Sequence, residues 1–333
     1  MENYSDLLKK FKNSQVLVVG DLMMDEYLWG NVDRISPEAP IPVLDVKKID
    51  FRPGGAANAA YNVKSLGDKV FLVGVVGVDE KGAILKKLLE EKGINADGIV
   101  FDNQRKTTVK ARVVAKNQQI VRIDIEDKTP IVPEIEEKIL TFIRERVKDL
   151  GAIIISDYGK GVITPTLCQQ IIALAKENNV LSLVDPKGTD ILKYRGCTII
   201  APNKKELSVA LNVPLEQLAQ EGRFLQAGKM MMAHIMSDNV LVKCGDEGMT
   251  LFEKNGNIFH FPALNQKAID VSGAGDTAIG VFALALASGI QKQEAVVLAS
   301  HACSIKVSKV GTSVVVPEEL EVSLANYVYP TQN

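Results

Sequence analysis

The chain has 333 residues, and its 39 lysines and arginines against 41 aspartates and glutamates give a formal net charge of −2. A charge this close to zero disfavours general binding to nucleic acid or to an anionic membrane surface. The length permits one large α/β domain or two smaller ones, and either could bury a substantial core.

Cysteine and histidine usage indicates a reducing compartment without zinc. The four cysteines lie far apart, at Cys168, Cys197, Cys244 and Cys303, and the three histidines are equally scattered. No metal-ligand spacing results, and buried thiols are the simpler interpretation. The N-terminus lacks the basic and apolar regions of a signal peptide, and the longest apolar run is short for a membrane span. We expect a soluble cytoplasmic protein.

Short runs rich in β-branched residues alternate with helical patterns along the chain. The predicted strands are residues 16–19, 71–76, 153–155, 181–184, 198–201 and 240–242. The predicted helices are residues 56–66, 81–92, 133–148, 164–178, 215–236 and 291–307. Continuous apolar strands separated by helices favour an α/β fold with a mainly parallel sheet covered on both faces.

Two segments break this alternation and predict a small accessory sheet. Residues 41–48 have strand character after a group of prolines, and residues 107–115 and 119–125 form a hairpin about residues 116–118. Alternation along the first hairpin strand places Val109 and Ala111 on one face, with Lys110 and Arg112 on the other.

A glycine turn over residues 270–277 directly precedes an apolar helical run over residues 278–287. The small residues Gly273, Ala274 and Gly275 would let backbone N–H groups approach a ligand at a helix N-terminus, which suits a phosphate undergoing transfer. Asp276 would then accept a hydroxyl proton. The alternative is an ordinary glycine-rich turn in which Asp276 only favours the helix N-terminus.

The turn resembles the C-terminal signature of the ribokinase-like (phosphofructokinase B) sugar kinases, and residues 52–58, Arg-Pro-Gly-Gly-Ala-Ala-Asn, resemble their N-terminal glycine motif. Within that family the chain is most similar to the D-glycero-D-manno-heptose 7-phosphate kinases, the kinase part of bifunctional ADP-heptose synthesis proteins. The stretches that carry this closer similarity are residues 20–25, 34–40, 117–119, 156–158 and 185–190.

The resemblance implies a ribokinase-like three-layer sandwich with a small β-sheet lid. We expect one kinase domain over residues 1–326, with lid segments at about 31–50 and 104–126, and a tail over residues 327–333. The implied activity is ATP-dependent phosphorylation of the C1 hydroxyl of heptose 7-phosphate, on the way to ADP-activated heptose for bacterial lipopolysaccharide. In the family the lid often also forms a dimer interface, so we expect a homodimer.

For catalysis we expect Asp276 to have a lowered pKa near the helix N-terminus and to remain ionised. It would orient the attacking hydroxyl and accept its proton in the transition state. The backbone amides of Gly273, Ala274 and Gly275 would receive the charge that develops on the transferring phosphoryl group.

The resemblance also implies a site for ATP and Mg²⁺. Asn203 and Glu206 match the family's N-x-x-E element, which helps to organise the magnesium-bound phosphates, largely through water. The same residues could form a helix N-cap and its capping-box partner, and both interpretations could hold together.

For the rest of the nucleotide site, Gly245 and Gly248 fit the family pattern and Ser300 replaces a frequent asparagine. Lys243 stands where threonine is common, and it could contact phosphate or face solvent. Some relatives bind a monovalent cation near the position of residues 311–313. The sequence does not establish whether this chain binds one.

The sugar would bind beyond the first strand, where open α/β sheets place ligands. Asp21, Asp25, Gly54, Gly55 and Asn58 form the predicted polyol-binding set, because carboxylates and amides pair well with vicinal hydroxyls. Asp25 could instead be a surface charge.

A phosphorylated sugar also needs cations. Residues 106–122 contain five basic residues and no acidic one, and we select Arg112 and Arg122 from them together with Arg34 and Lys187. The sequence does not show which side chains point inward, since the outer face of a lid is usually charged too.

The chain ends at Asn333 without an H-x-G-H motif for adenylyl transfer, so we expect a stand-alone kinase. Two rival functions are a same-fold kinase for ribose or fructose 6-phosphate and a non-catalytic sugar or nucleotide sensor. The presence of Asp276, Asn203 and Glu206 disfavours the sensor.

Overall fold

A computed structural model of the chain describes residues 4–116, 118–264, 268–325 and 327. Asn117, on which part of the heptose-kinase resemblance rests, and most of the predicted tail lie outside the described residues. Among the described helices none is long and apolar enough to cross a membrane.

The main sheet has nine strands in the order β13-β12-β11-β10-β9-β8-β1-β4-β5. The strands are β1 (Gln15–Gly20), β4 (Lys69–Gly77), β5 (Asn95–Asp102), β8 (Ala152–Ser156), β9 (Leu181–Asp185), β10 (Ile199–Ile200), β11 (Asn239–Lys243), β12 (Met249–Glu253) and β13 (Ile258–Phe261). All neighbouring strands pair in parallel except at the edge, where β12 is antiparallel to both β11 and β13.

Ten α-helices accompany the strands in the described part of the chain. They are α1 (Tyr4–Lys10), α2 (Ala56–Leu66), α3 (Glu80–Glu91), α4 (Pro133–Arg144), α5 (Pro165–Glu177), α6 (Lys204–Leu211), α7 (Glu221–Ile235), α8 (Ala274–Ala287), α9 (Lys292–Val307) and α10 (Pro317–Ala325). Short 3₁₀ helices lie at Phe11–Asn13, Val147–Asp149, Ile191–Tyr194, Leu215–Ala219 and Gly245–Glu247.

Successive residues of the central strands contribute to two separate hydrophobic cores. Val16 and Val18 of β1 pack in the core that contains α2, α8 and α9, whereas Leu17 and Val19 pack in the core that contains α4, α5 and α7. Alternate side chains of a strand point to opposite faces, so a continuous apolar strand is buried on both sides. The predicted three-layer α/β architecture is confirmed.

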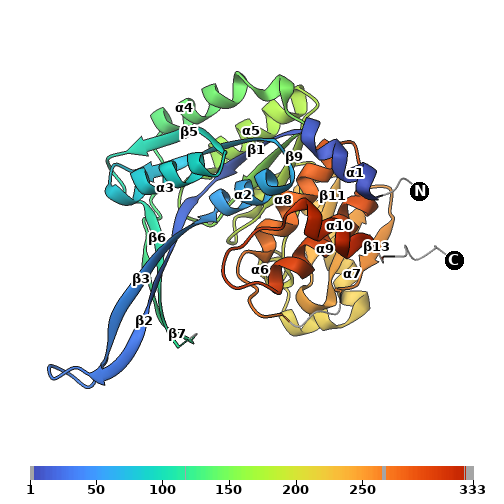
Figure 1. The fold of residues 1–333 in the computed structure, drawn as a ribbon. Coiled ribbons are helices and arrows are strands. Elements are labelled where there is room, and N and C mark those ends of the chain that lie inside the picture. The colour runs from blue at the N-terminus through green and yellow to red at the C-terminus, as the bar shows by residue number, and fades with distance from the viewer. Residues whose placement is uncertain (1–3, 117, 265–267, 326, 328–333) are drawn as a thin grey trace.

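A second, four-stranded sheet projects from one side of this sandwich (Figure 1). We call it the small sheet; its order is β3-β2-β6-β7, from β2 (Leu22–Ile35), β3 (Pro42–Gly55), β6 (Thr108–Ala115) and β7 (Gln118–Ile125). β2 begins buried and becomes exposed toward its outer end. The hairpin of β6 and β7 was predicted, and the strand at 41–48 is the outer part of β3.

Several elements differ from the sequence prediction. β2 was missed because its mixed residues do not alternate cleanly, and the antiparallel edge strands β12 and β13 were not predicted. The predicted helix over 215–236 is broken at Gln220, whose backbone is extended between a 3₁₀ helix and α7. The 3₁₀ helix buries only Leu218, whereas α7 buries Ala227, Gly228, Met231 and Ile235 at helical spacing, so the periodic pattern belongs to α7.

The topology creates one crevice at the carboxyl edge of the main sheet. Strand β1 lies between β4 and β8, and the strand order reverses there: β4 and β5 follow on one side of β1, and β8 and β9 on the other. Ligands of open α/β sheets bind at such a switch point. Asp21, Asp157, Asp185 and Lys243 lie at the carboxyl ends of β1, β8, β9 and β11, so charged side chains collect there.

Two glycines of α7 offer a matched test of this packing. A methyl group at Gly228 would lie 2.3 Å from the ring of Phe252, whereas one at Gly222 meets nothing within 4 Å. We expect Gly228→Ala to lower the free energy of unfolding by about 1–3 kcal/mol through overpacking. Gly222→Ala should be neutral or stabilising by up to about 1 kcal/mol. Urea unfolding of both variants measures this difference, and equal effects would contradict the packing of α7 on β12.

Candidate active site

The glycine turn opens α8 as predicted. Gly273 caps the helix with φ of 80°, a left-handed conformation that favours glycine. A methyl group there would lie 2.7 Å from the Asn58 amide nitrogen, which also restricts the position to glycine. Among the predicted amides, the Ala274 N–H already donates to the Val271 carbonyl at 3.2 Å. The N–H groups in the first turn of a helix lack intrahelical acceptors, so those of Gly275 and of Asp276, which was not predicted for this role, are suited to an anion.

Asp276 lies buried in the first turn of α8 between two hydrogen-bond donors. One carboxylate oxygen accepts a hydrogen bond of 2.5 Å from the Tyr158 hydroxyl, and the other accepts one of 2.6 Å from the Asn58 amide. On the next residue, the Thr277 hydroxyl donates to Asn62 of α2 at 2.8 Å. Asn58 was assigned to the sugar from sequence; the structure places it against Asp276.

The expected pKa of Asp276 was wrong in direction. Burial raises the pKa of this carboxyl to about 7, although hydrogen bonds from Tyr158 and Asn58 oppose the shift. Loss of hydration therefore outweighs the favourable helix N-terminus. A carboxylate with a pKa near neutrality is a better proton acceptor than an ordinary aspartate.

A buried ion pair lies beside the first turn of α8, which carries Asp276. The Lys243 ammonium pairs with the Asp185 carboxylate, and both side chains are largely buried. Burial opposes the charge of Lys243, but attraction to Asp185 and Glu206 raises its pKa overall. Lys243 does not face solvent, which excludes one of its two predicted placements.

Asn203 and Glu206 form a complete capping box at the start of α6. The Asn203 side chain accepts from the Glu206 N–H at 2.8 Å, and the Glu206 carboxylate accepts from the Asn203 N–H at 2.9 Å. The other Glu206 oxygen is 3.1 Å from the Lys187 ammonium. Lys187 was predicted to bind the sugar phosphate; the structure shows its contact with Glu206, and a role toward the sugar stays a prediction.

Magnesium fits this region only as an ion bound mainly by phosphate and water. No cluster of three or more histidine, cysteine or acidic side chains suited to a metal occurs among the described residues. The Glu206 oxygens already accept from Asn203 and Lys187, so a water-bridged contact is the form that these residues allow.

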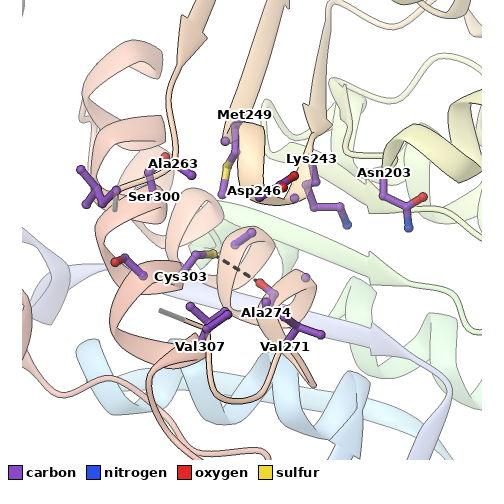
Figure 2. A pocket seen from close by; sticks show the side chains of 17 residues that line it. Asn203, Lys243, Asp246, Met249, Ala263, Val271, Ala274, Ser300, Cys303 and Val307 are labelled. Carbon is purple, nitrogen blue, oxygen red and sulfur yellow. Dashed lines mark hydrogen bonds between the residues drawn. The ribbon is translucent and has the colours of Figure 1, made fainter. Parts of the chain in front are cut away.

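A cavity of about 470 Å³ lies between α8, α9 and the end of β11 (Figure 2). Figure 2 shows Ser300, Cys303 and Val307 on one side of it and Lys243 and Asn203 on the other. The predicted residues Gly245, Gly248 and Gly275 also line it. Its size and mostly apolar wall are typical of a nucleotide pocket.

Two polar groups in this pocket lack partners. The hydroxyls of Ser300 and Ser304 lie one turn apart on α9, are buried, and make no hydrogen bond within the described structure. Buried polar groups without partners are uncommon in folded proteins. They fit a ligand with hydrogen-bonding edges, such as a purine nucleotide. Ser304 was missed from sequence, although its i, i+4 spacing from Ser300 on a predicted helix could have indicated it.

Asp21 is bound to the backbone rather than left free for a sugar. Its carboxylate accepts hydrogen bonds from the N–H groups of Tyr158, Lys160 and Val162 at 2.7, 3.1 and 3.1 Å. Burial nevertheless raises its pKa. Asp21 thus fixes the loop that carries Tyr158, and a direct contact with sugar hydroxyls stays a prediction.

Asp25 is a buried acid at the base of the small sheet, which excludes the surface-charge alternative. Its carboxylate is 2.7 Å from the Arg112 guanidinium. A methyl group at Gly54 would lie 3.2 Å from this carboxylate, so the glycine motif lets β3 pass close by. Gly55, with φ of 57°, then turns the chain into α2.

Three cations gather around Asp25 on one face of the small sheet. Arg52 and Lys110 are its register partners on β3 and β6. The guanidinium carbons of Arg52 and Arg112 lie 4.7 and 5.2 Å from the centre of the Tyr27 ring. Lys110 lies 5.7 Å from the centre of the Tyr158 ring. Arg52 was missed as a candidate, although it belongs to the glycine motif.

Two predicted cations do not join this group. Arg122 lies opposite Arg112 in the sheet, but it is exposed and bonded to Asp124 at 2.8 and 3.0 Å. Arg34 is nine residues beyond Asp25 on β2, which is about 30 Å along a strand. Arg34 therefore lies near the outer end of β2, too far from Asp25 to reach the crevice of the same chain.

Comparisons with known proteins agree with this geometry. The sequence profile described as pfkB family carbohydrate kinase matches residues 13–319. The chain belongs to the pfkB family of carbohydrate kinases. Among curated relatives, the bifunctional protein HldE of Geobacter metallireducens is 45% identical over 96% of this chain, and that of Trichlorobacter lovleyi is 42% identical over 94%. The matched regions cover 64% and 63% of those relatives, so this kinase spans less than two thirds of their length.

Solved structures confirm the ribokinase-like fold. Ribokinase from Thermotoga maritima superposes with a TM-score of 0.71 at 24% identity, covering 94% of this kinase and 100% of that chain. Phosphofructokinase-2 from Escherichia coli in complex with potassium gives a TM-score of 0.77 at 20% identity, with coverages of 94% and 98%. The catalysed reaction class, phosphorylation of a sugar, follows from the family.

The buried carboxyl predicts a pH dependence. Only ionised Asp276 can accept a proton, so kcat should fall as the pH drops through about 7. The Tyr158 hydrogen bond lowers the pKa of Asp276, so Tyr158→Phe should move this acidic limb to higher pH. Tyr194→Phe is the matched control, because Tyr194 is also buried but donates to Asp157 at 2.7 Å. A limb that stays in place in Tyr158→Phe would exclude Asp276 as the titrating group.

Proposed function

We propose that this sugar kinase transfers the γ-phosphoryl group of ATP to the C1 hydroxyl of D-glycero-D-manno-heptose 7-phosphate, giving the 1,7-bisphosphate for ADP-heptose biosynthesis. The observation that carries the proposal is the position of Asp276. Its carboxyl lies between the nucleotide cavity and the cations around Asp25. The relatives named bifunctional protein HldE and the sequence resemblance to heptose 7-phosphate kinases support the choice of sugar.

In the proposed reaction, Asp276 orients the sugar hydroxyl and takes its proton as the oxygen bonds to the γ-phosphorus. The bond from that phosphorus to the bridging oxygen breaks, and ADP leaves. The N–H groups of Gly275 and Asp276 stabilise the charge that develops on the phosphoryl oxygens. Positioning and charge neutralisation supply most of the rate enhancement.

The residues present fit the proposed cofactors. Ser300 and Ser304 would hydrogen-bond the nucleotide within the cavity, and Lys243 would approach its phosphates while paired with Asp185. Mg²⁺ would supply charge neutralisation at the β- and γ-phosphates, and Glu206 and Asn203 would hold its water shell.

On the sugar side, Lys110, Arg112 and Arg52 are the proposed contacts for the distal phosphate. Arg112 pairs with the buried Asp25, and Lys110 and Arg52 lie opposite Asp25 on the neighbouring strands. Arg52 is held by Asp50 at 3.5 Å and by the Val310 carbonyl at 3.3 Å, so both guanidinium groups are fixed before the substrate arrives. Preorganised guanidinium groups suit bidentate recognition of phosphate. Asp25 would in addition accept hydrogen bonds from sugar hydroxyls.

We further propose that the small sheet is the lid of a single kinase domain over residues 1–326 and that it pairs two copies of the chain in the cytoplasm. The outer strand β7 exposes a row of apolar side chains, at Ile120, Val121, Ile123 and Ile125. Exposed apolar residues on an edge strand are a typical contact surface. One solved phosphofructokinase-2 with this fold is described as a tetramer.

Asp276→Asn tests the catalytic role. The amide has a similar shape but is not a proton acceptor, so kcat should fall by about 10²–10⁴. Asp246→Asn serves as a control, because Asp246 lines the same cavity but is exposed and lacks the Tyr158 contact. ATP affinity measured by calorimetry should change little in both variants. Near-normal turnover in Asp276→Asn would contradict the proposed proton transfer.

A panel of acceptors tests the substrate. ADP release should show the highest kcat/KM for heptose 7-phosphate, ahead of fructose 6-phosphate, ribose and unphosphorylated heptose. Each charge-assisted hydrogen bond to the distal phosphate contributes about 1.5–3 kcal/mol, so loss of that phosphate should cost orders of magnitude. Arg112→Lys should narrow the difference between the two heptoses, whereas Arg34→Met should not. A higher value for ribose or fructose 6-phosphate would contradict the heptose assignment but not the family.

A further inference from the structure

A lysine on α9 is enclosed completely behind the phosphate-binding turn. Lys306 has a relative exposure of 0% and is among the largest fully buried side chains of the described chain. Its ammonium donates a hydrogen bond of 3.3 Å to the backbone carbonyl of Asp270. Burial lowers the pKa of Lys306, while the negative charges of Asp270 and Asp276 oppose that change.

The charge of Lys306 has no direct counter-ion. Within the described residues, no carboxylate lies at ion-pair distance from its ammonium, in contrast to the nearby Lys309, which is 2.6 Å from Glu319. An unpaired buried ammonium is costly unless other groups stabilise it. The Asp270 carbonyl supplies one such interaction, and an anion bound at the adjacent turn would supply another.

Asp270 connects this ammonium to the turn and to the loop after α9. Its carboxylate accepts from the N–H groups of Ser272 and Gly311, both at 2.8 Å. Its own N–H donates to the Val307 carbonyl at 3.1 Å. Asp270 is therefore held by three hydrogen bonds to backbone groups, one of them from Gly311. Gly311 belongs to residues 311–313, near which a monovalent cation was considered from the sequence.

We infer that the Lys306 ammonium takes the place of a monovalent cation behind the phosphate-binding turn, so that this kinase needs no potassium. A bound potassium ion is coordinated by several carbonyl and hydroxyl oxygens. Here the Asp270 carbonyl already accepts from a covalently attached cation. Lys306 would act as a positioning residue, because it holds the turn and adds positive charge behind its amides without touching the substrates.

This inference rests on the proposed use of ATP at the turn, but it does not depend on which sugar is phosphorylated. The first measurement needs no variant: kcat/KM for ATP is compared in potassium and in tetramethylammonium chloride at equal ionic strength, with the best acceptor of the panel. We expect less than about a twofold difference, since a built-in cation cannot be removed. ATP affinity by calorimetry in the same two salts gives a second readout without turnover.

The second measurement removes the ammonium. In tetramethylammonium, Lys306→Ala should lower both kcat/KM and affinity for ATP by about 10- to 100-fold, the range of a charge-assisted interaction. Potassium, rubidium or ammonium ions should restore much of that loss by occupying the space left by the side chain. Lys306→Met, which fills the space without a charge, should show the loss without restoration.

Lys309→Met is the matched control, because it removes a cation near the same helix end that is already paired with Glu319. It should lower the melting temperature without creating any dependence on potassium. Activation of the unaltered kinase by potassium of tenfold or more would overturn the inference and assign the unpartnered hydroxyls of Thr312 and Ser313 to an ion site. Normal ATP affinity in a folded Lys306→Ala variant would overturn it as well. Loss of turnover on heptose 7-phosphate alone would concern only the proposed substrate.

Discussion

The buried carboxyl of Asp276 and its two hydrogen bonds are the contact on which the crevice depends. Tyr158, from the loop after β8, and Asn58, from the first turn of α2, converge on it from different parts of the chain. Each donor requires its own support: Asp21 holds the loop of Tyr158, and the left-handed Gly55 directs the chain into α2. Burial then raises the pKa of Asp276 to about 7, which an exposed aspartate would not reach.

An ion pair lies on each side of this carboxyl, and in both pairs a cation contacts a buried carboxylate. Lys243 pairs with Asp185 beside the cavity between α8 and α9, and Arg112 pairs with Asp25 at the base of the small sheet. A cation held by a buried carboxylate loses little side-chain freedom when an anionic ligand arrives. The carboxylate also prevents the cation from being buried alone, which would be strongly unfavourable. Lys306 is the exception, since its buried charge faces a carbonyl group.

The small sheet links recognition to the main sheet through a continuous chain path. β2 follows Asp21 directly, so its buried first residues belong to the crevice and its exposed outer residues to the projecting hairpin (Figure 1). Parallel pairing with β6 brings Lys110 opposite Asp25 and Arg112 opposite Tyr27. One pair of strands therefore positions the acid, the aromatic ring and two cations on the same face.

The sequence by itself was sufficient to predict features that depend on a few neighbouring residues. The glycine turn before an apolar helix predicted an anion site with one acid, because small residues and helix polarity act over a few positions. The alternating apolar segments predicted the layered fold for the same reason. The pattern of residues 107–125 likewise predicted the β6–β7 hairpin, and Asn203 with Glu206 predicted a capping box that the structure contains.

Tertiary structure alone decided the ionisation and pairing of the site residues. The helix N-terminus suggested a lowered pKa for Asp276, but burial by α2 and the β8 loop reversed the direction. Lys187 and Arg34 were equivalent to Arg112 as sequence, yet only Arg112 lies against Asp25. Burial and ion pairing depend on which distant segments meet. The spacing of residues along the sequence does not show which distant segments pack together. The charged side chains could therefore be chosen as candidates but not assigned to partners.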